Sequence, residues 1–193
     1  LNDTQSLSGN VYFRYNRTRT LNGDLNDEFA GGPFDGISDD ESAANNRTRT
    51  TQRGTGASGQ WNLTTERQQL GVGGSIDYAR MHFSQTQEIG VIDASRGVAP
   101  TADPVLENAL RGTTRTSSIF ITDTVTLAKN LHLTAAARYN MSRVTTRDEI
   151  NLTPPNLDGD HSYHKLNPAL GLSWQVVPAL NAYAGFSQGN RVP

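Results

Sequence analysis

Apolar and polar residues alternate along residues 131–142, which read LHLTAAARYNMS. The odd-numbered positions hold Leu, Leu, Ala, Ala, Tyr and Met, and most even-numbered positions hold polar residues such as His, Thr, Arg, Asn and Ser. Successive side chains of a β-strand point to opposite sides of the sheet. The period of two therefore predicts a strand with one apolar face and one polar face.

The same period recurs along most of the chain. The further predicted strands are residues 7–20, 50–63, 70–87, 113–127, 163–177 and 180–188. Most of these runs are much longer than the ~5–6 residues common in soluble sheets. A strand that crosses the hydrocarbon of a bilayer needs about 9–11 residues. The length of the runs therefore favours a sheet that spans a membrane.

The connections between these strands alternate between long and short. Long polar connections, rich in Gly, Pro and Asp, lie at residues 21–46, 88–111 and 151–162. Short turns lie at residues 64–68, 128–130 and 178–179. Bacterial outer-membrane barrels combine short periplasmic turns with long extracellular loops. We predict an all-β fold, an antiparallel transmembrane β-barrel segment of about seven strands, with lipid on the apolar face and a wet lumen on the polar face.

The composition agrees with this prediction. Only 35% of residues are hydrophobic, yet the chain has six Tyr, six Phe and two Trp, and its net charge is only -2. Disordered chains have few aromatic residues and a high net charge. A barrel needs apolar residues on one face only, so a low mean hydropathy is compatible with a protein that spans a membrane. No run approaches the ~18 apolar residues of a transmembrane helix.

Two classes of chemistry are excluded by composition. There is no Cys, so disulfides and thiolate metal sites are absent. The basic residues are scattered and balanced by acids, which is not the footprint of a nucleic-acid-binding protein. Single-chain bacterial barrels have an even number of strands from eight upward. Seven strands therefore predict a piece of a larger up-and-down barrel.

Three segments resemble strands of TonB-dependent outer-membrane receptors. Residues 119–127, IFITDTVTL, are similar to the family's aromatic-x-x-Asp-Thr strand. Residues 131–140, LHLTAAARYN, resemble a strand in which Ala136 replaces the usual Gly and Asn140 the usual Asp. Residues 166–174, LNPALGLSW, and 181–193, NAYAGFSQGNRVP, resemble the next strand pair. The resemblance is clearest over residues 116–193, and the first 115 residues share only the strand–loop style.

The resemblance implies a parent barrel of 22 strands with an N-terminal plug domain, driven by the inner-membrane TonB complex. Residues 1–193 would be a partial barrel, with the plug domain absent from this stretch. The implied function is uptake of a scarce ligand, with a ferric siderophore expected first and cobalamin or a glycan also open. The implied location is the bacterial outer membrane, and the implied partners include its lipid and lipopolysaccharide. No cofactor and no nucleic acid are expected.

Arginines are the first candidates for ligand binding. We expect four of them to line the lumen and attract an anionic ligand: Arg14, Arg80, Arg138 and Arg143. The alternative is that they pair with acids across the barrel wall. Four others lie at the loop ends of the first two strands, where contact with lipopolysaccharide is a hypothesis: Arg17, Arg19, Arg47 and Arg49.

A metal site is a weaker candidate. Two carboxylates and two imidazoles fall within seven residues, and such groups bind divalent metals: Asp158, Asp160, His161 and His164. Turn formation by Asp-Gly-Asp explains the same residues. The acidic segment 35–41 lacks the spacing of an EF-hand and is better explained as a solvated loop.

The chain is not expected to be an enzyme. It contains no nucleophile elbow, no His-Glu-x-x-His and no phosphate-binding loop. Three alternatives to a receptor stay open from the sequence. They are a passive porin-like channel, a soluble all-β binding module, and a barrel enzyme whose catalytic residues have not been recognised.

Overall fold

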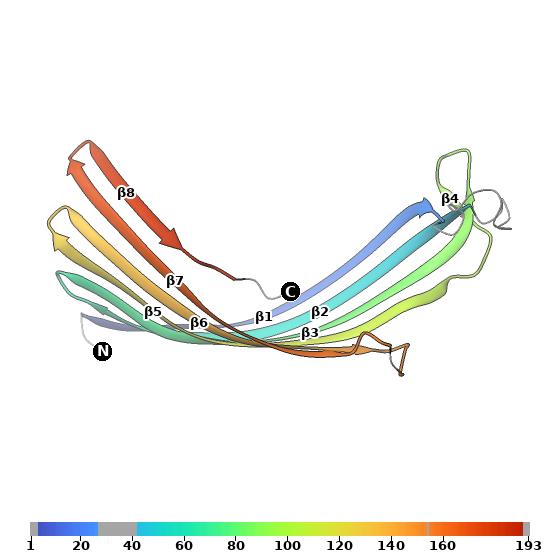
Figure 1. The fold of residues 1–193 in the computed structure, drawn as a ribbon, viewed down its shortest axis with the longest axis horizontal. Helices are drawn as coiled ribbons and strands as arrows, with labels where there is room; N and C mark the ends of the chain where they lie inside the picture. The colour runs from blue at the N-terminus through green and yellow to red at the C-terminus, as the bar shows by residue number, and fades with distance from the viewer. Residues whose placement is uncertain (1–3, 27–41, 154, 191–193) are drawn as a thin grey trace.

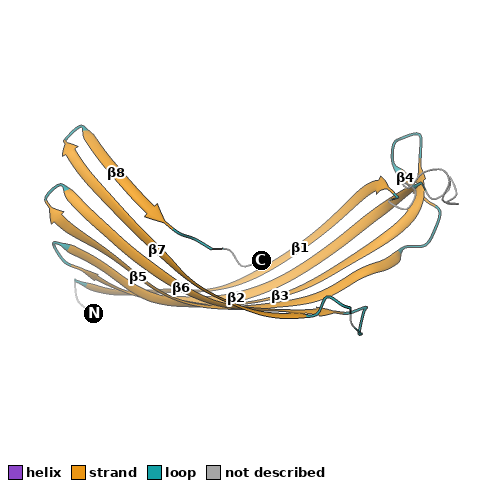
Figure 2. Cartoon of the chain, viewed as in Figure 1, coloured by secondary structure: helices purple, strands orange, loops and turns teal. Residues whose placement is uncertain are grey.

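The computed structural model describes residues 4–26, 42–153 and 155–190, and it places them in a single bent β-sheet (Figure 1). The strands are β1 (Gln5–Leu25), β2 (Ala43–Thr64), β3 (Gln68–Ile92), β4 (Val98–Pro100), β5 (Val105–Ala128), β6 (Leu131–Asp148), β7 (Gly159–Val177) and β8 (Leu180–Ser187). Figure 2 shows strands and loops throughout the described chain. None of the described residues belongs to a helix able to cross a membrane.

Neighbouring strands of the sheet are also neighbours in sequence. The order is β1-β2-β3-β5-β6-β7-β8, every pairing is antiparallel, and the short β4 pairs only with the end of β3. Within the described sheet, β1 and β8 each have one partner strand. The prediction of seven long antiparallel strands in an up-and-down order is confirmed, and the chain forms half a barrel.

Register places apolar residues beside apolar residues. Directly paired residues share a face, and one row across five strands contains Leu7, Trp61, Val72, Ile121 and Ala137. We call this side the apolar face and its apolar rows the apolar belt. The opposite side, the polar face, carries mainly Ser, Thr, Asn and Gln. The predicted alternation between two unlike faces is therefore confirmed.

The two faces differ in exposure because the sheet is curved. On the apolar face of the inner strands, the side chains of Ile76 and Ile119 are each 62% exposed. On the polar face, Ser118 and Ser142 are only 3% and 4% exposed. Side chains crowd together on the concave side of a bent sheet and spread apart on the convex side. The polar face is therefore the concave one, as the lumen side of a barrel must be.

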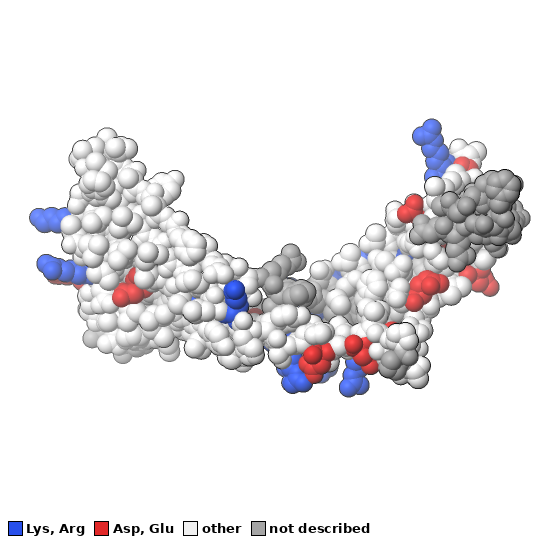
Figure 3. Space-filling view, in the orientation of Figure 1, with Lys and Arg blue, Asp and Glu red and all other residues white. Residues whose placement is uncertain are grey.

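The apolar belt has the height of a membrane. On β6 it extends from Leu131 to Met141, which is ten residue steps or about 34 Å of strand. A strand tilt of about 45° reduces this to a height of about 24 Å, close to the ~25 Å apolar band of outer-membrane barrels. In Figure 3 the surface between the turn tips on the left and the middle of the sheet is nearly free of charged side chains.

The strands are longer at their loop ends than the sequence predicts. β1 continues to Leu25, β2 already begins at Ala43, and β5 begins at Val105 rather than near Thr113. The predicted long connections are correspondingly shorter. Asn, Asp and Gly in these segments have low β-propensity, but pairing with the adjacent strand outweighs propensity. Among the described residues, the ladder of β1 and β2 closes with the amide of Asn26 donating to the carbonyl of Ser42 at 3.2 Å.

A short hairpin that the sequence does not predict joins β3 to β4. One carboxylate oxygen of Asp93 accepts hydrogen bonds from the amides of Ser95 and Gly97 at 2.8 and 3.0 Å. The Ser95 hydroxyl donates to the same oxygen at 2.6 Å. This bond is the largest cause, and the amide bonds the next, of a pKa of the Asp93 carboxyl below its usual 3.8. Arg96 has a φ of 64°, the left-handed conformation that the tight turn requires. The acidic segment 35–41, compared above with an EF-hand, lies outside the described residues.

Candidate functional site

Arg138 is the best-anchored cation of the polar face. Its guanidinium donates to the hydroxyl oxygens of Ser75 and Ser118 at 3.1 and 3.0 Å, and its Nε donates to Asn140 Oδ1 at 2.9 Å. These partners come from β3, β5 and β6, so the arginine fixes three strands relative to one another. None of the partners is charged. The positive charge of Arg138 is therefore available to an anion on the concave side.

Phe120 packs against Arg138, and Gly73 packs against Phe120. The guanidinium carbon lies 5.4 Å from the centre of the Phe120 ring, within the range of a cation–π contact. The ring in turn covers Gly73, where a Cβ would lie 2.5 Å from Phe120 Cζ. Gly73 pairs with Phe120, and Phe120 pairs with Arg138 across the sheet. The absence of a side chain at Gly73 therefore leaves space for the Phe120 ring, and the ring contacts the Arg138 guanidinium.

A second cluster lies on the polar face near β1. The hydroxyl of Tyr12 donates to Asp77 Oδ1 at 2.5 Å, across the intervening strand β2. The residue between them is Gly56, where a Cβ would lie 2.5 Å from the Tyr12 ring and 2.6 Å from Asp77 Oδ1. Arg14 follows on the same face, next to Gly54. The glycines of β2 thus leave space above that strand, and side chains of β1 and β3 contact each other there.

Amide side chains continue the polar face toward β8. Asn140 and Asn167 both donate to Asn190 Oδ1, at 3.2 and 2.8 Å. Asn167 Oδ1 is buried and has no hydrogen-bond partner among the described residues. The wall from Arg14 to Asn190 therefore presents guanidinium, hydroxyl and amide groups, with the carboxylate of Asp77 occupied by Tyr12. Such a surface can bind an oxygen-rich anion through several weak donors at once.

The four predicted lumen arginines divide between the faces. Arg14 and Arg138 lie on the polar face, as expected, whereas Arg80 and Arg143 lie on the face of the apolar belt. This corrects the expectation that all four share one face. Arg80 is an even number of residues from Ile76 on β3, and Arg143 likewise from Met141 on β6, so each must share its neighbour's side.

The candidate metal ligands do not converge. Asp160 pairs with Arg143, whose Nε donates to it at 2.7 Å. Asp158 accepts from the backbone amide of Asp148 at 2.7 Å. His161 pairs with Val144 and His164 with Met141, which places the imidazoles on opposite faces. In the described part of the chain, no group of three or more His, Cys, Asp or Glu residues is placed to hold a metal ion.

Several residues of the polar face were not singled out from the sequence. Tyr12, Gly56 and Asp77 are far apart in sequence and meet only through the register of three strands. Phe120 interrupts the polar side of its strand, and this break in alternation was the signal available. Phe120 occupies this polar side because its ring packs against the guanidinium of Arg138.

Comparison with known proteins agrees with this geometry. A family model described as "TonB dependent receptor-like, beta-barrel" matches residues 1–193. That match covers the whole chain, including the first 115 residues, where the sequence resemblance was weak. The comparison with curated proteins gives no match.

Solved structures share the fold at low sequence identity. The ferric-catecholate import receptor Fiu from E. coli K12, in an open form, has a TM-score of 0.68 at 12% identity over 97% of this chain and 33% of its own. The ferric preacinetobactin receptor BauA from Acinetobacter baumannii has a TM-score of 0.60 at 15% identity, over 95% of this chain and 28% of its own.

The unliganded ferric citrate transporter FecA has a TM-score of 0.59 at 14% identity, over 95% of this chain and 24% of its own. The chain thus spans between a quarter and a third of the length of these structures. At such identities the likeness describes the fold, and the ligands in these names belong to those proteins.

Proposed function

The chain belongs to the TonB-dependent receptor-like β-barrel family, and from this premise we propose that it forms part of the wall of an outer-membrane receptor for a ferric siderophore. The family is one of transport receptors. In the whole protein, the loops capture the ligand, the concave face receives it, and a plug domain rearranges under the force of the TonB complex. Outer-membrane lipid and lipopolysaccharide surround the apolar face.

The observation that supports this proposal most is the environment of Arg138. A cation held by Ser75, Ser118 and Asn140 keeps its charge unneutralised, because all three partners are neutral. Ferric siderophores are commonly anionic and rich in oxygen atoms. An arginine prepositioned on the concave face can bind such a ligand with a smaller ordering cost for the side chain.

Uptake of radioactive iron by cells that carry the full-length receptor tests the proposal. The probes are ferric catecholate, ferric hydroxamate and ferric citrate complexes, with cobalamin and a glycan as the competing ligand classes. Arg138→Gln is expected to weaken binding of the transported complex by about tenfold, the factor given by ~1.4 kcal/mol. Arg67→Gln is the matched control, because Arg67 lies in the turn between β2 and β3. Equal uptake by both variants would refute the proposed role of Arg138.

A passive porin-like channel is the alternative function. It would have the same two faces, but its transport would need no energy. Uptake measured in cells with and without TonB separates the two, because only a receptor loses transport when TonB is removed. A soluble binding module would instead be recovered from lysed cells without detergent.

A further inference from the structure

Ten of the fifteen arginines lie on the apolar face of the sheet, and all ten lie on the loop side of the apolar belt. We call them the arginine field. They are Arg17 and Arg19 on β1, Arg47, Arg49 and Arg53 on β2, Arg80 on β3, Arg111 and Arg115 on β5, and Arg143 and Arg147 on β6. They face away from the lumen, so an imported ligand cannot be the reason for their number.

Carboxylates neutralise only part of the arginine field. Arg47 pairs with Glu88 at 2.9 Å, Arg111 pairs with Glu149 at 2.6 Å, and Arg143 pairs with Asp160. Among the described residues, the other seven arginines make no ion pair. Within the part of the chain that the structure describes, the face therefore carries a large positive charge just beyond the membrane core, although the whole chain has a net charge of -2.

Arginines even lie directly opposite one another in the ladders. The cross-strand pairs are Arg19 with Arg49, Arg53 with Arg80, Arg115 with Arg143, and Arg111 with Arg147. Like charges opposite one another destabilise a sheet. Four such pairs on one face leave a repulsion that an anion between the guanidiniums would offset.

The arginine field begins at the depth of the lipid headgroups. The Arg80 and Arg115 guanidinium carbons lie 5.3 and 5.6 Å from the Tyr78 ring centre, and that of Arg53 lies 5.9 Å from the Tyr15 ring centre. Tyrosines in such positions mark the interface between hydrocarbon and headgroups. Ile76 lies only two residues before Tyr78 and belongs to the apolar belt. An anion bound to these arginines would therefore lie directly above the acyl chains.

The apolar face has three hollows in and next to the arginine field. A hollow of about 640 Å³ is lined by Arg53, Arg80, Arg111 and Arg147. The next hollow, of about 330 Å³, is lined by Val11, Ala57 and Ile76 below Tyr78 and Arg115. A third, also of about 330 Å³, shares Ala57 and Ile76 with the second.

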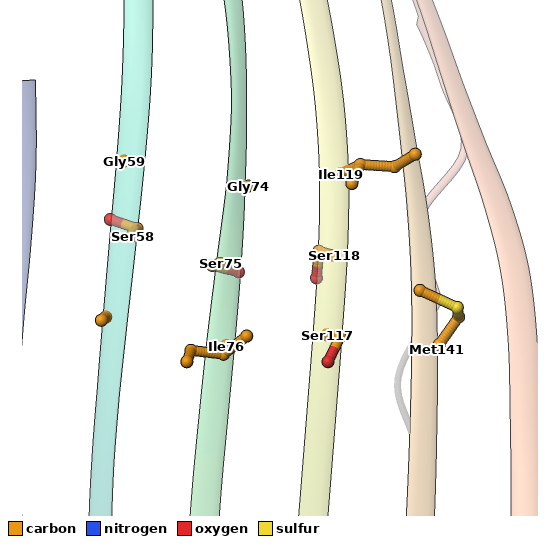
Figure 4. A pocket seen from close by; sticks show the side chains of 10 residues that line it. Ser58, Gly59, Gly74, Ser75, Ile76, Ser117, Ser118, Ile119 and Met141 are labelled. Atoms are coloured by element: carbon orange, nitrogen blue, oxygen red, sulfur yellow. The ribbon is translucent and has the colours of Figure 1, made fainter. Parts of the chain in front are cut away.

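Figure 4 shows Ile76, Ile119 and Met141 around the bare backbone at Gly59 and Gly74 in this third hollow. The second and third hollows thus form one apolar groove that runs toward the middle of the belt, and the charged hollow lies on its loop side.

We propose that the arginine field binds the phosphate groups of lipid A, the phosphorylated glycolipid of the outer leaflet, and that one acyl chain lies in the groove. Guanidinium groups bind phosphate through paired, charge-assisted hydrogen bonds. The proposal rests on the proposed function for the membrane in which the barrel lies. It extends the loop-end hypothesis for Arg17, Arg19, Arg47 and Arg49 by six arginines closer to the belt and by the groove.

Binding of purified lipid A to the full-length receptor in detergent tests the proposal. Arg80→Gln with Arg115→Gln removes the two guanidiniums over Tyr78, and about tenfold weaker binding is expected. The control, Arg67→Gln with Arg96→Gln, removes the same charge from two turns outside the field and is expected to bind normally. Gly59→Leu tests the groove, because a Cβ at Gly59 meets nothing within 4 Å and the larger side chain fills the hollow. It too is expected to weaken binding.

Three results would overturn the proposal. Dephosphorylated lipid A that binds as tightly as lipid A would show apolar contact without phosphate recognition. Phosphatidylglycerol that binds equally well would show general attraction of acidic lipids. Equal losses in the double variant and its control would show that position is irrelevant. TonB-dependent uptake is measured separately. Loss of uptake with normal lipid A binding would count against the proposed function alone, and normal uptake without lipid A binding would count against the lipid A site alone.

Discussion

Gly73 shows how one residue without a side chain organises the polar face. Phe120 lies over it and Arg138 lies over Phe120, so a change at Gly73 propagates to the candidate ligand contact. Gly73→Ala would place a Cβ 2.5 Å from both the ring and the carbonyl oxygen of Gly59. We expect a loss of about 1–3 kcal/mol in the free energy of unfolding. The midpoint of urea unfolding of the full-length receptor in detergent measures it.

Gly59→Ala is the matched control for that substitution. No atom lies within 4 Å of a Cβ at Gly59, so we expect unchanged stability or a gain of about 0.4–1 kcal/mol from a less flexible unfolded chain. Equal destabilisation by both alanines would mean that any strand glycine matters, and that the Phe120–Arg138 stack has no special role.

Arg53 of β2 and Arg80 of β3 are directly opposite each other and form a like-charge pair across two strands. Arg53→Glu converts this cross-strand pair of β2 and β3 into an ion pair. In lipid-A-free detergent we expect a gain of about 0.2–1 kcal/mol in the free energy of unfolding, read from the same urea transition. If lipid A stabilises the arginine field, adding it should stabilise the unsubstituted receptor more than this variant. A variant that is less stable even without lipid A contradicts this account of the pair.

The hairpin between β3 and β4 is expected to respond to acid. The carboxyl of Asp93 has a pKa below its usual 3.8 because it accepts bonds from Ser95 and Gly97. A lowered folded-state pKa means that the stabilisation is complete above the ordinary value and is lost as the pH falls through the lower one. Hydrogen exchange of residues 93–100 should stay protected down to about pH 4 and lose protection below it. Asp93→Ala should lack protection throughout, and Asp103→Ala should behave as the native chain.

The strands themselves were largely predictable, because alternation such as LHLTAAARYNMS is a direct consequence of a two-faced sheet. Their loop ends were not, since residues 43–46 and 105–111 resemble loop in composition and become strand only through their partners. The faces of Arg80 and Arg143 were available from parity along their strands. The contact of Tyr12 with Asp77 was not, because it depends on the register of β1, β2 and β3 together.

The whole sheet exposes both a large apolar face and two unpaired edges. Leu7, Val11 and Phe13 are more than two-thirds exposed, and β1 and β8 each lack a second partner among the described strands. Such edges pair with other copies. We expect residues 1–193 expressed alone to aggregate in buffer and to need detergent for dispersion. Light scattering that finds a monomer without detergent would contradict the assignment of the apolar face to lipid.

The strict pairing of rows also constrains how the length of this protein can change during evolution. One residue inserted into the middle of β2 would turn the side chains that follow it in the strand to the other side, so Trp61 would enter the pore and Ser58 would meet hydrocarbon. Insertions within strands are therefore tolerable in twos, or singly where a bulge absorbs them. The register already shifts between Gln85 and Thr86, beyond the membrane core. Homologues should differ freely in loop length while the parity of each span stays constant.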